Sequence, residues 1–122
     1  MAEKILIVED DEEMRLFMAD ILKENGYLVT TPVDSYVALE MAENNAYDLI
    51  ALDEKSPLMD GKAFAQVLRE THSQTPILLL TDALNDQDLE SFGELGIQGV
   101  ILKPFQVDHL LHHVRRILPA AP

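Results

Sequence analysis

The stretch Leu49-Ile50-Ala51-Leu52-Asp53 decides the fold, because four apolar residues lead directly into an acid. A loop with the sequence Glu-Lys-Ser-Pro-Leu-Met-Asp-Gly follows at 54–61. A short apolar run bounded by turn residues is typical of a buried strand in a parallel sheet. We therefore expect a strand at 49–52 with Asp53 at its carboxyl end.

Three further apolar runs also lead into side chains capable of chemistry. The residues that follow them are Glu9, Asp10 and Asp11 after 5–8, Thr81 after 77–80, and Lys103-Pro104 after 100–102. The carboxyl ends of the strands share one edge in an open parallel sheet. We therefore expect these side chains to converge on a single crevice.

Helical stripes separate the strand-like runs. The expected helices lie at about 11–24, from 34 or 35, from 61, at about 85–94 and at about 106–118, with a further strand at 27–31. Alternation between the two periods is typical of repeated βα units and predicts an α/β fold with a parallel sheet. The helix at 85–94 has the weakest pattern, interrupted by Gly93 and ended near Gly96, which indicates a mobile element.

The chain has 122 residues and no cysteine, which bounds the class of protein. This length predicts one domain, at 1–118, with 119–122 as a tail or the start of a linker. Without cysteine, disulfides and thiolate metal sites are excluded, and a reducing compartment is favoured. The sequence shows neither a signal peptide nor a membrane span, so we expect a cytoplasmic protein.

The net charge is −13, from 22 acids against 9 lysines and arginines. Such a surface repels phosphate backbones and anionic lipids. We therefore expect no direct nucleic-acid binding and no membrane partner. His109 and His113 could be drawn as a metal pair on the last helix, but a solvated helical face is favoured because no further ligand is indicated.

The acids at the expected crevice indicate a metal ion and a nucleophile. Glu9, Asp10 and Asp53 would repel one another, and a hard divalent cation such as Mg²⁺ would keep all three ionised. The ammonium of Lys103 and the hydroxyl of Thr81 would neutralise and hydrogen-bond a phosphoryl group on Asp53. Asp53 is therefore the candidate nucleophile.

A simpler reading exists for each acid taken alone. An isolated acid after a strand is usually a turn residue or a helix cap. Asp11 fits the role of a cap for the first helix, and Asp60 that of a turn acid before Gly61. The coincidence of reactive groups at four strand ends favours a functional site for the others.

Four segments together resemble the receiver domain of bacterial two-component response regulators, in the CheY-like superfamily. They are ILIVEDDEEMR at 5–15, YDLIALDEKSPLMDGKAF at 47–64, PILLLTDA at 76–83 and ELGIQGVILKPF at 94–105. The resemblance covers essentially the whole chain. It implies a flavodoxin-like, doubly wound fold: a five-stranded parallel sheet of order 2-1-3-4-5 with helices on both faces.

The resemblance also implies roles for particular residues. Asp53 would accept a phosphoryl group from a phosphohistidine, Thr81 would hydrogen-bond that group, and Lys103 would pair with it. The Lys103-Pro104 peptide would be cis. The implied Mg²⁺ ligands are the carboxylates of Glu9, Asp10 and Asp53 and the backbone carbonyl of Lys55.

Three positions depart from the family pattern. The residue after Thr81 is usually small, but here it is Asp82, and an unpaired carboxylate there would oppose a phosphoryl group by about 3 kcal/mol per charge. We hypothesise that Lys55 pairs with Asp82 across the pocket mouth. Alternatively, the Lys55 ammonium reaches the acidic cluster, or both side chains extend into solvent. Val100 stands where active receivers typically carry Tyr or Phe, so a switch would act through the loop after Thr81 and the helix at 85–94.

The resemblance implies a receiver module of a phosphorelay, a signalling protein and not an enzyme. Its partners would be a histidine kinase or histidine phosphotransferase and a downstream protein or output domain. One alternative is a pseudo-receiver, a protein-interaction module that signals without aspartyl phosphate. Another is a phosphatase or phosphotransferase similar to haloacid dehalogenases, but those enzymes place the nucleophile after the first strand, with a second acid two residues on, where this chain has Lys55.

Overall fold

The computed structural model describes residues 2–56, 58–71 and 73–118. Within them, five parallel strands form one sheet in the order β2-β1-β3-β4-β5. The strands are β1 (Lys4–Val8), β2 (Leu28–Thr30), β3 (Leu49–Asp53), β4 (Ile77–Thr81) and β5 (Ile97–Leu102). The predicted flavodoxin-like order 2-1-3-4-5 is confirmed. The predicted tail at 119–122 lies outside the described residues.

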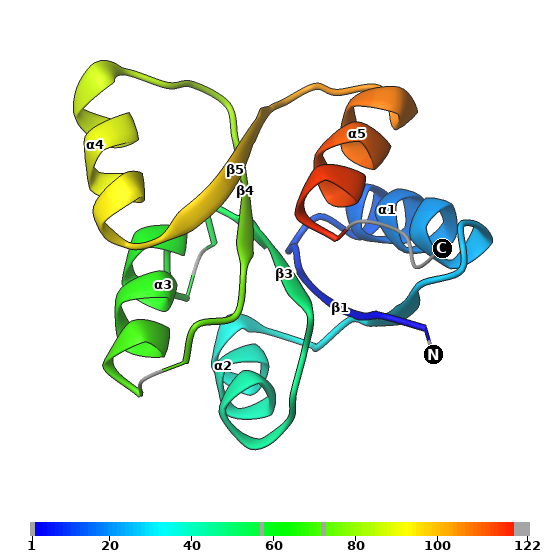
Figure 1. Cartoon of the computed structure of the whole chain (residues 1–122), viewed down its shortest axis with the longest axis horizontal. Helices are drawn as coiled ribbons and strands as arrows, with labels where there is room; N and C mark the ends of the chain where they lie inside the picture. The colour runs from blue at the N-terminus through cyan, green and yellow to red at the C-terminus, as the bar shows by residue number, and fades with distance from the viewer. Residues whose placement is uncertain (1, 57, 72, 119–122) are drawn as a thin grey trace.

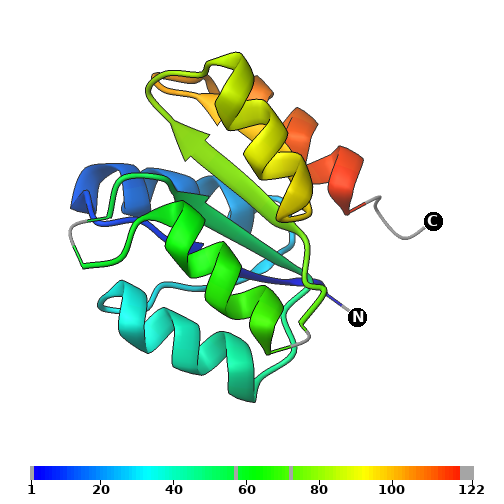
Figure 2. The ribbon, with the colours of Figure 1, turned by 90° about the vertical axis from the view of Figure 1, so that its left-hand side faces the viewer.

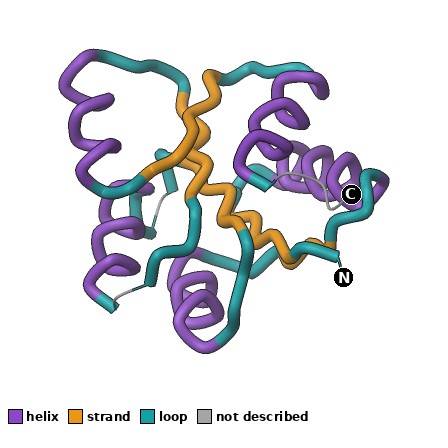
Figure 3. Tube along the Cα trace, viewed as in Figure 1, coloured by secondary structure: helices purple, strands orange, loops and turns teal. Residues whose placement is uncertain are grey.

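A helix follows each strand, as the alternating tube colours of Figure 3 show. The helices are α1 (Glu12–Glu24), α2 (Ser35–Asn44), α3 (Gly61–Glu70), α4 (Asp86–Glu94) and α5 (Val107–Ile117). Helices α1 and α5 cover one face of the sheet, and α2, α3 and α4 cover the other (Figures 1 and 2). No helix of the described residues is long and apolar enough to span a membrane.

The three central strands, β1, β3 and β4, bury both of their faces, which explains their near-continuous apolar sequences. In β1, Ile5 and Ile7 pack into the core under α1 and α5, whereas Leu6 and Val8 pack into the core under α2 and α3. This alternation follows from the two-residue period of a strand. Two hydrophobic layers therefore fix the sheet from both sides and hold its carboxyl edge in place.

Four helices begin at a side chain that caps them. The capping residues are Asp11, Asp34, Asp60 and Asn85, and each accepts a hydrogen bond from a backbone N–H of the first turn. Such caps satisfy donors that the helix itself leaves unpaired. The predicted cap at Asp11 is confirmed, and Asp60 also serves as a cap.

The structure corrects three boundaries. Strand β2 has only three residues, and β5 begins at Ile97, before the predicted run at 100–102, because Gln98 and Gly99 conceal the strand in the sequence. The pairing of β5 with β4 is irregular at this point. Helix α4 continues through Gly93, so the predicted interruption there is wrong, and the chain turns at Gly96, where φ is 71°. The expected mobility of α4 stays a prediction.

Gly61 allows α3 to begin directly against the backbone that follows Asp53. Its N–H donates to the carbonyl of Glu54 at 2.8 Å. A Cβ atom at this position would lie 2.9 Å from the Cα of Glu54 and 3.2 Å from the carbonyl oxygen of Asp53. A side chain at residue 61 would therefore displace the segment that carries the candidate nucleophile.

We predict that Gly61→Ala destabilises the fold by about 1 to 3 kcal/mol, because the added methyl overpacks against backbone. The matched control is Gly93→Ala, since a Cβ there meets nothing within 4 Å. Because Gly93 lies in the last turn of α4, that change should stabilise the fold by less than the full helix-interior value of about 1 kcal/mol. Urea unfolding of both variants measures the difference, and equal effects would contradict this account of Gly61.

Candidate functional site

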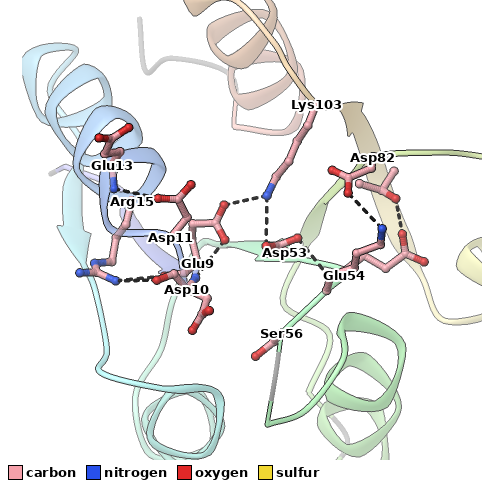
Figure 4. Close-up of polar contacts among 12 residues, drawn as sticks. Glu9, Asp10, Asp11, Glu13, Arg15, Asp53, Glu54, Ser56, Asp82 and Lys103 are labelled. Carbon is pink, nitrogen blue, oxygen red and sulfur yellow. Dashed lines mark hydrogen bonds and ion pairs between the residues drawn. The ribbon is translucent and has the colours of Figure 1, made fainter.

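The carboxyl edge of the sheet gathers four of the expected side chains. Asp53 and Thr81 are the last residues of β3 and β4, whereas Glu9 and Lys103 directly follow β1 and β5. Glu9, Asp53 and Thr81 are buried, although all three are polar. Figure 4 shows Lys103 reaching down between Glu9 and Asp53. The strand ends therefore do converge, as the sequence predicts.

Lys103 forms the centre of this cluster. Its Nζ atom lies 2.8 Å from Oε1 of Glu9 and 3.1 Å from Oδ2 of Asp53. Burial disfavours the ammonium, but its hydrogen bonds to the two carboxylates outweigh burial and raise the pKa of Lys103. The side chain is thus a stable cation. The Lys103-Pro104 peptide bond is cis, as predicted.

Glu9 is a carboxyl group of the cluster whose pKa lies well above its ordinary value. Burial, followed by its interaction with Asp53, raises the pKa of Glu9 to about 7, even though Lys103 acts in the opposite direction. The backbone around it is held in place, because Arg15 donates to the carbonyl of Glu9 at 3.3 Å. Two buried carboxyl groups share one ammonium, so a second cation at the site would be stabilised by their negative charge.

Thr81 donates its hydroxyl to a partner that the sequence did not indicate. Its hydroxyl donates to the carboxylate of Glu54 and lies 3.0 Å from the carbonyl oxygen of Ala83. The structure therefore places the Thr81 hydroxyl on Glu54 and not on Asp53. The available signal was the position of Glu54, which directly follows the candidate nucleophile at a strand end.

Lys55 and Asp82 form the hypothesised pair across the pocket mouth, with 3.0 Å between Nζ and Oδ2. The alternative in which both side chains extend freely into solvent is therefore wrong. Both side chains are more than half exposed, so the pair itself contributes about 1 kcal/mol or less to stability. The backbone N–H of Lys55 donates to Oδ1 of Asp53 at 3.1 Å, which orients the carboxylate.

A cavity of about 640 Å³ opens beside the cluster. It is lined by Asp10, Glu54, Lys55, Ser56, Asp60 and Lys62. Among the described residues, no three histidine or acid side chains stand ready to hold a metal ion. Mg²⁺, however, needs only one or two carboxylates and keeps several waters, so the oxygen donors and the adjacent space fit this ion. The predicted ligand set of Glu9, Asp10, Asp53 and Lys55 stays a prediction.

The histidines of α5 follow the expected pattern only in part. His109 and His112 are exposed, but His113 is half-buried against β5, and its Nδ1 atom is buried without a hydrogen-bond partner. Burial lowers the pKa of His113. The prediction of a wholly solvated face is therefore wrong at His113, because the ring packs beside Gly99, where β5 has no side chain.

A family model for the response regulator receiver domain matches residues 5–115. The chain belongs to the response regulator receiver domain family. Receiver domains are modules of two-component signalling. The residues of this receiver domain that match the family include the whole carboxyl edge of the sheet.

The relatives of this receiver domain are response regulators. It is 34% identical over 119 residues to the response regulator ArlR of Staphylococcus saprophyticus, covering 98% of this chain and 54% of the relative. It is equally identical to the transcriptional regulatory protein PcoR of Escherichia coli, covering 98% of this chain and 53% of that protein. The chain thus spans about half the length of the curated relatives it matches.

Solved structures with the same fold include the chemotaxis response regulator CheY4 of Vibrio cholerae, at a TM-score of 0.88 and 31% identity, covering 97% of this chain and 100% of that one. Another is the receiver domain of a sensor histidine kinase of Pseudomonas aeruginosa, at a TM-score of 0.84 and 29% identity, covering 98% and 100%. That structure is described with a magnesium ion coordinated in its active-site cleft.

We predict that Glu9 makes this receiver domain less stable as pH rises. The pKa of Glu9 is raised from 4.5 to about 7 in the native state, so the folded chain holds a proton that the unfolded chain has already lost. Stability that is present below about pH 4.5 is then lost as pH rises towards 7. Between pH 5 and 8 this loss is on the order of 2 kcal/mol.

Glu9→Gln should remove this part of the pH dependence, because glutamine does not titrate. The measurement is urea unfolding at pH 5 and pH 8 with a chelator of divalent cations present. Glu40→Gln, at an exposed position on α2, is the control with the same change of charge. An identical pH dependence in wild type and Glu9→Gln would contradict the assignment.

Proposed function

We propose that this receiver domain accepts a phosphoryl group on Asp53 from a phosphohistidine in a step that depends on Mg²⁺. The observation that carries the proposal is the buried Asp53 carboxylate with the Lys103 ammonium 3.1 Å from it. A buried carboxylate that stands beside a fixed cation can attack an anionic donor that an unaccompanied carboxylate would repel. The resemblance to phosphoacceptor receivers supports the same role.

In the proposed reaction an oxygen of Asp53 forms a bond to phosphorus, and the bond from phosphorus to the histidine nitrogen breaks. The nitrogen keeps the electron pair of that bond, and because the other ring nitrogen of the phosphohistidine carries a proton, the leaving group is neutral imidazole. Lys103 pairs with the negative oxygens of the transferred group, and Thr81 donates its hydroxyl to one of them. These groups stabilise charge where it develops, which is how proteins catalyse phosphoryl transfer.

The oxygen donors at this edge suit magnesium. Glu9, Asp10, Asp53 and the backbone carbonyl of Lys55 would hold it. When bound, the ion supplies positive charge to the carboxylates and to the phosphoryl oxygens. The raised pKa of Glu9 is consistent with this assignment, because burial and then the neighbouring Asp53 disfavour the ionised carboxylate, which a bound cation would stabilise.

The proposed partners are a histidine kinase or histidine phosphotransferase and a downstream protein or output domain, in the cytoplasm. The domain is proposed to be 1–118, with 119–122 as a tail or the start of a linker. Val100 is half-buried and has no aromatic ring that could move inward, so the proposed switch runs through the loop after Thr81 and α4.

The pseudo-receiver alternative is not favoured by the named relatives, which are response regulators.

We predict that incubation with Mg²⁺ and phosphoramidate adds one phosphate to the wild-type chain and none to Asp53→Ala. Removing Mg²⁺ with a chelator should reduce the gain to background. Intact-mass spectrometry measures both results. A folded wild-type chain that gains no phosphate with Mg²⁺ present, or that gains it equally in Asp53→Ala, would overturn the proposed function.

We also predict that Lys55 protects the reaction from Asp82. Lys55→Ala leaves the Asp82 carboxylate unpaired beside the incoming phosphoryl group, so phosphorylation should slow by about tenfold or more, from the Coulomb repulsion at an effective dielectric near 20. Lys55→Ala combined with Asp82→Ala removes both charges and should recover most of the rate. A double variant as slow as Lys55→Ala would show that Lys55 acts in another way.

A further inference from the structure

Glu54 and Lys55, which directly follow Asp53, contact the last residue of β4 and the residue after it. Glu54 accepts the hydroxyl of Thr81, and Lys55 pairs with Asp82 at 3.0 Å. In Figure 4, Glu54 and Asp82 lie together on the side of Asp53 that is remote from Glu9. The loop that the proposed switch must move is therefore held by the segment that carries the phosphoacceptor.

The backbone fixes the contact between Glu54 and Thr81. Residues of β3 and β4 are paired up to Asp53 and Leu80, and the N–H of Glu54 then donates to the carbonyl of Leu80 at 2.8 Å. The pairing thus continues one residue past the end of β3 and sets Glu54 beside Thr81. Because Thr81 is only 1% exposed, water cannot readily replace Glu54 as its partner.

The Thr81 hydroxyl has one proton to donate. The hydroxyl donates that proton to the carboxylate of Glu54, and the carbonyl oxygen of Ala83 is a second acceptor at 3.0 Å. A phosphoryl group on Asp53 requires the same proton. A hydrogen bond to a charged acceptor is stronger than one to a neutral acceptor, so the two anions compete for Thr81.

We propose that Glu54 is a positioning residue that holds Thr81 away from the phosphoryl site, so that phosphorylation of Asp53 requires Glu54 to release the hydroxyl. This inference rests on the proposed function. It assigns to Glu54 the role of an internal competitor for the phosphoryl group. Two contacts hold the loop after β4 to the residues after Asp53: Glu54 with Thr81 and Lys55 with Asp82. Release of Thr81 breaks the first of them.

The test compares Glu54→Asp and Glu54→Gln with the wild type. Glu54→Asp keeps the negative charge but shortens the side chain, so it should lose the reach to Thr81. Glu54→Gln keeps the length but removes the charge, so the bond should weaken. Glu40→Gln on α2 is the matched control for a lost surface charge, because Glu40 is exposed on another element.

Two readouts are needed. The first is the rate of phosphate gain with Mg²⁺ and phosphoramidate, which should rise at least about fivefold in both Glu54 variants when a charge-assisted hydrogen bond no longer competes. The second is the methyl NMR resonance of Thr81 without metal or donor. It should shift in both Glu54 variants and not in Glu40→Gln.

Each other outcome decides against the inference. If the Thr81 resonance does not move, Glu54 does not hold Thr81. If only Glu54→Gln is faster, Glu54 acts by charge repulsion and not by holding the hydroxyl. If the wild type gains phosphate as fast as both variants, this inference alone fails. If none of the three proteins gains phosphate, the proposed function fails and the inference fails with it.

Discussion

The ammonium of Lys103 between Glu9 and Asp53 is the interaction on which the site depends. Lys103 follows β5 and joins Glu9, which follows β1, to Asp53, the last residue of β3; these groups come together because the strands are parallel and share one carboxyl edge. Without this cation, two buried carboxyl groups would face each other unpaired, at a cost of several kcal/mol. The ion cluster therefore requires the sheet, and within the cluster the carboxylate of Asp53 lies 3.1 Å from the Lys103 ammonium.

A second set of contacts lies beside this cluster, on the side of Asp53 that is remote from Glu9 (Figure 4). Glu54 and Lys55 hold the end of β4, so the state of Asp53 and the position of the following loop are physically connected. In the cluster around Lys103, two carboxyl groups share one ammonium. In the second set, Glu54 and Asp82 each have a partner of their own, Thr81 and Lys55. A phosphoryl group would draw on both sets, since it needs Lys103 from the first and Thr81 from the second.

The strand ends were predictable from sequence because an apolar run followed by a polar residue is a local pattern. Parallel pairing and the helix cap at Asp11 followed from the same kind of signal, whereas the strand order followed from the resemblance to receiver domains. Gln98 and Gly99 hid the start of β5, because a strand at the edge of a sheet needs fewer apolar residues. The Glu54–Thr81 bond and the burial of His113 depend on pairing between segments distant in the chain, which a single sequence does not reveal.

The most direct test of this account is a crystal structure with Mg²⁺ and beryllium fluoride, which mimics a phosphoryl group. We predict beryllium fluoride bonded to Asp53, with Lys103 and the Thr81 hydroxyl both turned to its fluorines and Glu54 released from Thr81. A structure with no beryllium fluoride on Asp53, in which Lys103 still joins Glu9 to Asp53 and Thr81 still donates to Glu54, would contradict it.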